Sequence, residues 1–299
     1  MKKSNIYIIA PCICLVVIGV IVLIILMKPR LAQPSYPVSR HIRYAFTLNN
    51  KTNSVIKNAG FRACAPVSRT ATQKCSGLYS SHPYRLITDD LGNHVLNFSF
   101  KDIPPFATKI ISIKADLLLS DIANPIAVTD LKPFLRPERY IESDDPDICR
   151  LARKLKVNAT SPVKTAENIF HWVAGNVQYS GYLKNARGAL YALKNKMGDC
   201  TEFMYLFVAL CRASKIPARC IGGYVCLEDR ILNPGDYHNW AEFYEDGLWR
   251  IVDPQNKIFM KSQSNYIAMK IIEESPDNPM PQFGRFRVKG TGLEVKMNQ

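Results

Sequence analysis

The sequence GDCTEFMYLFVALCRA at residues 198–213 has the pattern that decides the fold of the second half of the chain. Apolar side chains recur in it at three- and four-residue intervals, at Phe203, Leu206, Phe207, Leu210 and Ala213. This spacing predicts a helix that begins around Asp199 and ends at residues 215–217, Lys-Ile-Pro. Cys200 then lies in the first turn, where the partial positive charge of the helix N-terminus favours an anionic sulfur and backbone N–H groups are free.

A second stretch, HNWAEFYEDGLWRIVD at residues 238–253, predicts a β-hairpin, because Asp246-Gly247 separates two apolar runs. Folding about this turn brings Asp253 opposite or diagonal to His238, and cross-strand side chains lie about 5 Å apart. The carboxylate can then hold one imidazole nitrogen and leave the other free. Together with a cysteine at a helix start, this pair has the composition of a nucleophile, its base and the group that orients the base.

Residues 41–128 alternate apolar and polar side chains with a period of two, which predicts half-buried strands. The clearest runs start at Ile42, Leu96 and Ile111, and turn signals lie between them. We expect a small antiparallel, sandwich-like β domain in which no set of residues suggests chemistry. Its simplest role is that of a scaffold or of a domain that guides substrate.

The pattern becomes helical after residue 133. Ser143 and Asp144 can cap a helix that has Pro146 in its first turn. Ser161-Pro162 begins a second helix in the same way. Strands are expected at residues 218–225, 240–244 and 249–252.

Residues 6–27 carry no charge and would span about 33 Å as a helix, close to the thickness of a hydrocarbon core. Residues 28–33 offer no small-x-small cleavage site, so an uncleaved transmembrane anchor is predicted. A count of the flanking basic residues would place the body in the cytoplasm. A short tail before a long apolar run is instead typical of a signal anchor. We therefore expect a single-pass protein of the plasma (inner) membrane with an extracytoplasmic body.

The chain of 299 residues is 47% hydrophobic and 21% charged, which excludes a disordered, collagen-like or low-complexity protein. Its formal net charge of +14 favours contact with anionic partners. The basic residues are scattered rather than interleaved with aromatic ones, so we expect no nucleic-acid partner. No phosphate loop, EF-hand or zinc-ligand spacing is present in the sequence, so neither a metal nor a cofactor is expected.

The nine cysteines fall into groups. Two of them, Cys12 and Cys14, lie in the predicted anchor as small apolar residues. If the body is extracytoplasmic, Cys64 and Cys75 are the best candidates for a disulfide on spacing alone. Three more are expected to be core residues, namely Cys211, Cys220 and Cys226.

Three motifs in this order, Gly198-Asp199-Cys200, residues 238–242 (HNWAE) and Val252-Asp253-Pro254, resemble the core of the transglutaminase-like superfamily of the papain-like fold. Two further stretches, IPAR at residues 216–219 and GGYV at residues 222–225, fit the same pattern. The resemblance covers about residues 144–259. The β region also looks like the N-terminal domain of membrane-anchored bacterial members.

The resemblance implies an α+β fold and a triad with Cys200 as nucleophile, His238 as general base and acid, and Asp253 as the group that orients His238. The implied chemistry is thiolate attack on an amide carbonyl, followed by transfer of the resulting thioester to an amine or to water. The Cys200 backbone N–H is one expected oxyanion donor. A ring donor is expected upstream, and Tyr179 or Trp172 could supply it. Trp172 lies on an apolar helical stripe and is expected to pack in the core.

The predicted fold is thus an N-terminal transmembrane helix, a β domain and a papain-like, transglutaminase-like core. The expected parts are a tail (1–5), an anchor (6–27), a linker (28–40), the β domain (41–128), a second linker (129–143), the catalytic domain (144–285) and a C-terminal segment (286–299). The predicted partner is a protein or peptide substrate. A cell-envelope cysteine peptidase or amidase and a non-enzymatic binding module are the alternatives. Glu242 is expected to be an ion-pair partner rather than a catalytic acid.

Overall fold

The computed structural model describes residues 34–274, residue 280 and residues 284–299, of which Ser35–Gln299 form one compact unit. The predicted anchor at residues 6–27 lies outside the described residues. Among the residues that are described, no helix has the length and apolar character needed to span a membrane.

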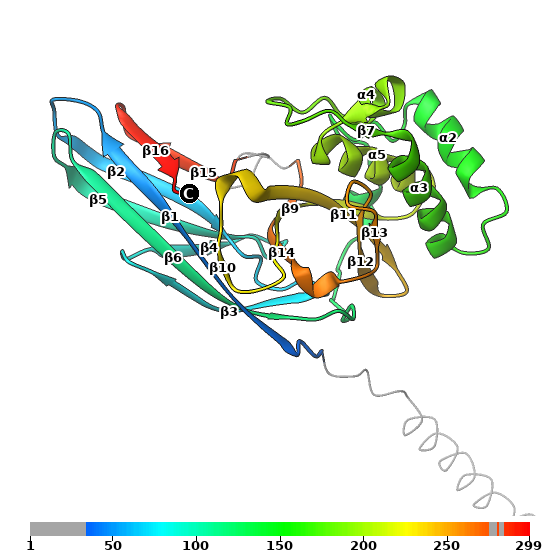
Figure 1. The fold of residues 1–299 in the computed structure, drawn as a ribbon, viewed down its shortest axis with the longest axis horizontal. Coiled ribbons are helices and arrows are strands. Elements are labelled where there is room, and N and C mark those ends of the chain that lie inside the picture. The colour runs from blue at the N-terminus through cyan, green and yellow to red at the C-terminus, as the bar shows by residue number, and fades with distance from the viewer. Residues whose placement is uncertain (1–33, 275–279, 281–283) are drawn as a thin grey trace, which may run out of the picture. The chain divides into compact units, whose positions relative to one another are not determined.

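The first part of this unit is a sandwich of two mainly antiparallel sheets (Figure 1). One sheet contains β10 (Arg230–Ile231), β1 (Val38–Asn50), β6 (Thr108–Leu119) and β3 (Gln73–Ser80), with β16 (Leu293–Met297) also paired to β1. The other contains β15 (Phe286–Lys289), β2 (Ile56–Ala65), β5 (His94–Ile103) and β4 (Arg85–Thr88). Their inner faces share one core, in which the Phe46 ring lies 5.0 Å from Phe61 and 5.4 Å from Phe286.

The C-terminal segment forms part of this sandwich. Strands β15 and β16 pair with β2 and β1, which lie near the other end of the chain. Their short patterns at residues 286–289 and 293–297 gave no strand prediction from the sequence, because pairing partners supplied by tertiary structure decide whether such short segments become strands.

The second part combines helices with a separate sheet. The helices are α2 (Pro146–Lys156), α3 (Pro162–Asn176), α4 (Ala189–Asn195) and α5 (Cys200–Ala213), with 3₁₀ turns η1 (Lys132–Leu135), η2 (Pro234–Asp236) and η3 (Gln263–Asn265). The sheet has the order β13 (Ile258–Phe259), β12 (Leu248–Asp253), β11 (Tyr237–Glu245), β9 (Ala218–Val225) and β14 (Tyr266–Ile272), and β7 (Gln178–Tyr179) pairs with β8 (Met197–Gly198). This is the expected α+β arrangement.

Helix α5 is the centre of the second part. Every residue from Glu202 to Arg212 is buried, so the helix is enclosed by more than the predicted apolar stripe. One side packs against Ala241, Phe243 and Val252 of the sheet, and the other meets the remaining helices. A helix buried all round has its position fixed by its neighbours.

The helix caps follow the sequence with one correction. Ser161 caps α3 as predicted. At α2 the cap is Asp145, whose side chain accepts hydrogen bonds from the N–H groups of Asp147 and Ile148, rather than Ser143 or Asp144. The reason is that Pro146 occupies the first helical position, so the residue directly before it is the N-cap.

Two buried amide side chains of the sandwich continue the hydrogen bonding of edge strand β14. Gln73 accepts from Ala268 N at 2.9 Å and donates to Ala268 O at 3.0 Å. Asn93 accepts from Ile271 N at 2.7 Å and donates to Ile271 O at 2.9 Å. The backbone groups on the free edge of β14 are thereby hydrogen-bonded by side chains of the sandwich, which holds the two parts together as one unit.

A buried ion pair crosses the sheet between β9 and β11. Arg219 and Glu242 are direct cross-strand partners, and Nη2 of the arginine lies 2.6 Å from Oε2 of the glutamate. The Arg219 guanidinium also lies 4.0 Å above the ring of Trp249. Glu242 is therefore an ion-pair partner, as the sequence indicates, and both charges are compensated inside the protein.

All seven cysteines among the described residues are free thiols, so the disulfide suggested for Cys64 and Cys75 is not formed. The two residues lie on strands of different sheets. The Cys64 thiol faces the carbonyl of Gly284 and the Cys75 thiol that of Gly77. Burial raises the pKa of each thiol to about 11.

Two glycines give a matched test of this packing. A methyl group at Gly223 would overlap the carbonyl oxygen of Ile267 on the paired strand, whereas Gly175 in α3 faces open space. We expect Gly223→Ala to lower the free energy of unfolding by about 1–3 kcal/mol through overpacking. Gly175→Ala should raise it by up to about 1 kcal/mol through helix propensity. Urea unfolding followed by circular dichroism measures both, and equal effects would contradict the close packing of Gly223 against Ile267.

Candidate active site

The first turn of α5 is fixed by a reciprocal pair of hydrogen bonds. Asp199 is the N-cap and its Oδ1 accepts from Thr201 N at 2.8 Å, while Glu202 Oε2 accepts from Asp199 N at 3.1 Å. This capping box makes Cys200 the first residue of the helix. The Cys200 N–H therefore has no acceptor within the helix and is free to act on a ligand.

The same two carboxylates hold the loop that precedes α4. Asp199 Oδ2 accepts from Leu183 N and Glu202 Oε1 from Arg187 N, each at 2.9 Å. Burial raises the pKa of Glu202, and the N–H groups of Arg187 and Asp199 oppose that rise. Any side chain at Gly198 would overlap Glu202, so glycine is required there for Asp199 and Glu202 to hold the loop.

His238 on β11 faces both other candidate residues. Its Nε2 lies 2.7 Å from Asp253 Oδ2, and the Cys200 side chain lies close enough to contribute to the raised pKa of its ring. Because Nε2 is engaged by the carboxylate, Nδ1 is the ring nitrogen available to the thiol. The side chain of His238 is 13% exposed and that of Asp253 is 1% exposed, so the pair is largely shielded from water.

The Asp253 carboxylate accepts further hydrogen bonds from Tyr266 and Asn256. Tyr266 donates its hydroxyl to Oδ2 at 2.9 Å, and Asn256 donates its side-chain amide to the same oxygen at 2.7 Å and its backbone N–H to Oδ1 at 3.1 Å. Burial and the neighbouring carboxylate raise the pKa of Tyr266, so its phenol stays protonated and remains a donor. A buried carboxylate needs such partners, and they fix its orientation toward His238.

Charge at the site is set by this pairing. Burial by itself lowers the pKa of His238, but the hydrogen bonds to Asp253 and Cys200 and the negative charge of both groups raise it to about 10. The imidazole is therefore protonated at neutral pH and lies between a carboxylate and a sulfur atom.

A hydrogen bond between the side chains of Asn239 and Thr201 helps to fix the distance between His238 and Cys200. Asn239 donates to the Thr201 hydroxyl at 3.0 Å. Each of these residues directly follows one of the pair, His238 on β11 and Cys200 on α5. The bridge therefore joins the helix N-terminus to the strand at the point where thiol and imidazole meet.

The ring donors considered for an oxyanion hole have different surroundings. Tyr179 lies opposite Gly198 in the pairing of β7 with β8, and Gly198 is two residues before Cys200. Tyr179 is 58% exposed. Trp172 packs against the core of the helical part, and the Lys196 ammonium lies 4.1 Å above its ring. Tyr179 is thus at the rim beside Cys200, whereas Trp172 has the packing role that the sequence indicates.

The sequence did not predict four residues of the site: Thr201, Asn239, Asn256 and Tyr266. Asn256 had a local signal, since it follows Asp253 by three residues in the same turn. Tyr266 had none, because its contact with Asp253 depends on how β14 and β12 fold into one sheet.

Across the described residues, no group of three or more His, Cys, Asp or Glu side chains could hold a metal ion.

Comparison with known protein families gives a match over the part of the chain that carries the candidate residues. A family model described as the transglutaminase-like superfamily matches residues 150–254, which contain all three candidate residues. The chain carries a transglutaminase-like domain. A search of curated protein sequences finds no match.

One solved structure extends the likeness beyond this domain. A candidate cysteine protease from Cytophaga hutchinsonii is similar over 87% of this chain and 92% of its own, with a TM-score of 0.56 and 21% sequence identity. The periplasmic domain of TgpA from Pseudomonas aeruginosa covers 76% of this chain and 89% of its own, with a TM-score of 0.40 and 15% identity. The first of these supports the fold over both parts of the described unit.

Thiol labelling tests the assignment of the nucleophile. We expect Cys200→Ala to abolish rapid modification of the protein by iodoacetamide, because Cys200 is the half-buried thiol beside an imidazolium. Cys211→Ala is the matched control, since Cys211 lies on the same helix and burial raises its pKa. Peptide mapping by mass spectrometry locates the label. Unchanged labelling of Cys200→Ala would remove Cys200 from this role.

The charge state of His238 gives a second prediction. In NMR titrations its imidazole should stay protonated through neutral pH and lose its proton near pH 10. Its contribution to stability is accordingly complete below the ordinary histidine pKa of about 6.5 and is lost as the pH rises toward 10. Cys200→Ala and Asp253→Asn should each lower the pKa, since each removes a negative partner. A wild-type value near 6.5 would contradict the hydrogen-bonded geometry.

Proposed function

We propose that the transglutaminase-like domain is a thiol enzyme that acts on amide bonds in proteins or peptides through a thioester on Cys200. The observation that carries this proposal is the line of contacts from the Cys200 thiol through His238 to Asp253, with the thiol at the N-terminus of α5. A structural cysteine needs neither an oriented imidazole nor a free helix N-terminus.

In the first half of the reaction, the Cys200 sulfur, having given its proton to His238, attacks the carbonyl carbon of the amide. The carbonyl oxygen becomes negatively charged, and the Cys200 N–H at the start of α5 is placed to stabilise it. His238 then gives its proton to the departing nitrogen, the C–N bond breaks, and an amine or ammonia leaves. Asp253 holds the ring in position and stabilises its positive charge throughout.

In the second half, an acceptor attacks the thioester carbon and His238 takes its proton. The carbon–sulfur bond breaks and Cys200 is restored. A primary amine as acceptor gives transamidation, and water gives hydrolysis. The same three residues perform both reactions, so a cell-envelope peptidase or amidase is the alternative outcome of one mechanism.

We also propose that residues 6–27 anchor the enzyme in the plasma (inner) membrane as a single span, with the body outside the cytoplasm. The support is the uncharged length of this segment and the lack of a cleavage site after it. Attachment would place the domain near protein substrates of the cell envelope. A non-enzymatic binding module is disfavoured by the intact set of three candidate residues.

The test supplies both partners of the reaction. Purified protein is incubated with a glutamine-containing protein and a fluorescent primary amine, beside Cys200→Ala and Cys211→Ala. We expect covalent incorporation of the amine with the parent protein and Cys211→Ala, and a loss of at least 1000-fold with Cys200→Ala. New peptide fragments without incorporated amine would identify a peptidase. Neither product from a protein with a reactive Cys200 would contradict the proposal.

A further inference from the structure

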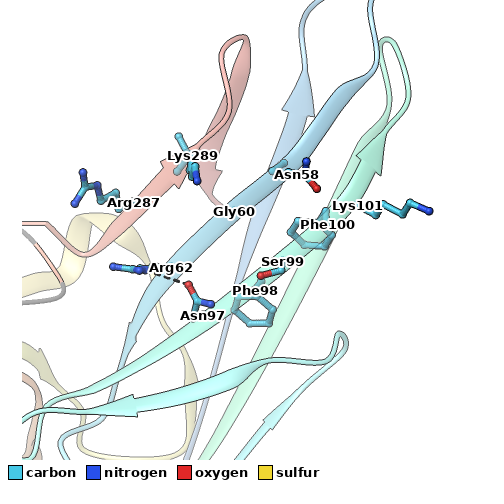
Figure 2. Close-up of a pocket in the computed structure, with 12 residues that line it drawn as sticks. Asn58, Gly60, Arg62, Asn97, Phe98, Ser99, Phe100, Lys101, Arg287 and Lys289 are labelled. Atoms are coloured by element: carbon cyan, nitrogen blue, oxygen red, sulfur yellow. Dashed lines mark hydrogen bonds between the residues drawn. The ribbon is translucent and has the colours of Figure 1, made fainter.

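The outer face of the second sandwich sheet contains a hollow of about 700 Å³ between β15, β2 and β5 (Figure 2). Its floor includes Gly60 and Ser99, which are direct cross-strand partners and have little or no side chain. The two small residues leave the space that the longer side chains around them enclose.

The hollow is surrounded by positive charge. Arg287 and Lys289 come from β15, Arg62 from β2 and Lys101 from β5, as Figure 2 shows. None of the described residues that line the hollow is acidic. A concave surface that carries charge of one sign concentrates the electrostatic potential and attracts ions of the opposite sign.

The positive side chains form a row across the sheet. Arg287 is the direct partner of Arg62, Arg62 of Asn97, and Asn97 of Arg85 on β4. Arg62 donates its Nε–H to Asn97 at 3.0 Å, which holds that guanidinium in place. Arg287 and Arg62 are therefore on the same face of neighbouring strands, where cross-strand side chains lie close to one another.

The nearby pair Lys57 and Asp102 provides a contrast. These two exposed residues are also direct partners on β2 and β5, and they have opposite charges, as is usual for stabilising cross-strand pairs. The charge of one sign is therefore a property of the hollow rather than of the whole sheet.

The segment that leads into β15 contacts the strand of the candidate active site through Arg285, two residues before Arg287. Its guanidinium donates to the carbonyl of Pro234 at 2.7 Å and lies 5.0 Å from the centre of the Tyr237 ring. Tyr237 directly precedes His238.

We propose that this basic hollow binds an extended acidic segment of the polypeptide substrate. The inference rests on the proposed function in so far as the ligand is a substrate. Arg287 and Lys289 lie two residues apart on one strand, about 7 Å, which is also the distance between same-face side chains of an extended peptide. Alternate carboxylates of such a peptide match these two cations. A flat lipid surface would reach the rim of the hollow but not its floor.

The experiment measures binding without chemistry. The full chain carrying Cys200→Ala, in neutral detergent, is titrated against a fluorescein-labelled peptide of alternating Glu and Ser, and the anisotropy is recorded. The matched probe replaces each Glu by Gln. The charge-reversal variant is Arg287→Glu/Lys289→Glu. Its control is Arg153→Glu/Lys154→Glu, which makes the same change in net charge on the exposed face of α2.

We expect the Glu-Ser peptide to bind at least tenfold more tightly than the Gln-Ser peptide, and binding to weaken as salt is raised. The reversal variant should lose at least tenfold in affinity, and the control less than twofold. Absence of Glu-Ser binding, or an equal loss in the control, would overturn the proposal. So would displacement of the peptide by phosphatidylglycerol added to the micelles at equal anionic charge, which would identify a lipid surface instead.

The outcome is independent of the proposed reaction, because the protein used for binding lacks the nucleophile. If amine transfer and hydrolysis both fail while the reversal variant loses the peptide, the proposed function fails and the acidic-peptide site stands. If activity is present and the peptide does not bind, the proposed function stands and the acidic-peptide site fails.

Discussion

The reciprocal hydrogen bonds between Asp199 and Glu202 are the constraint on which the candidate site depends. They start α5 at Cys200, and they also hold the loop before α4 through Leu183 and Arg187. The rest of α5 is buried on all sides, so the cap fixes one end of an element that cannot shift along its axis. The thiol position is thus determined by packing and by two carboxylates, rather than by contacts of the thiol itself.

A second constraint converges on Asp253. Its carboxylate accepts from Tyr266, Asn256 and His238, and it is almost fully buried. These donors come from β14, from the turn after β12 and from β11. A ring that is held by one nitrogen on a fixed carboxylate presents the other nitrogen in one direction, which the Asn239–Thr201 bridge aligns with Cys200. The sheet and the helix therefore meet with little freedom where proton transfer would take place.

The sandwich contributes more than a separate scaffold. Gln73 and Asn93 complete the hydrogen bonds of β14, the strand that supplies Tyr266, and Val67 packs with Trp240 beside it. Arg285 connects β15 to Tyr237. The sheet that contains β15 carries the basic hollow on its outer face, so the sandwich both supports the strand that supplies Tyr266 and presents a positively charged surface. Four of the basic residues are grouped in this hollow, which composition alone does not reveal.

The sequence by itself determined the elements whose signals are local. The helix start at Cys200, the cap at Ser161 and the hairpin that places Asp253 near His238 each depend on residues within a few positions or on one turn. It also marked Glu242 as an ion-pair partner. Where the local signal was ambiguous, as at Asp145, the choice of cap was wrong by one or two residues because the position of Pro146 decides it.

Only the tertiary structure decided the contacts between segments that are distant in the sequence. Tyr266 meets Asp253, Asn239 meets Thr201, and Arg62 lies opposite Arg287, in each case because separate elements are brought together by packing. The candidate Cys64–Cys75 pair is not bonded, since spacing along the chain does not say which group each thiol faces, here the carbonyls of Gly284 and Gly77. Local propensity is set by neighbouring residues, whereas side-chain partners depend on which strands share a sheet and in which register.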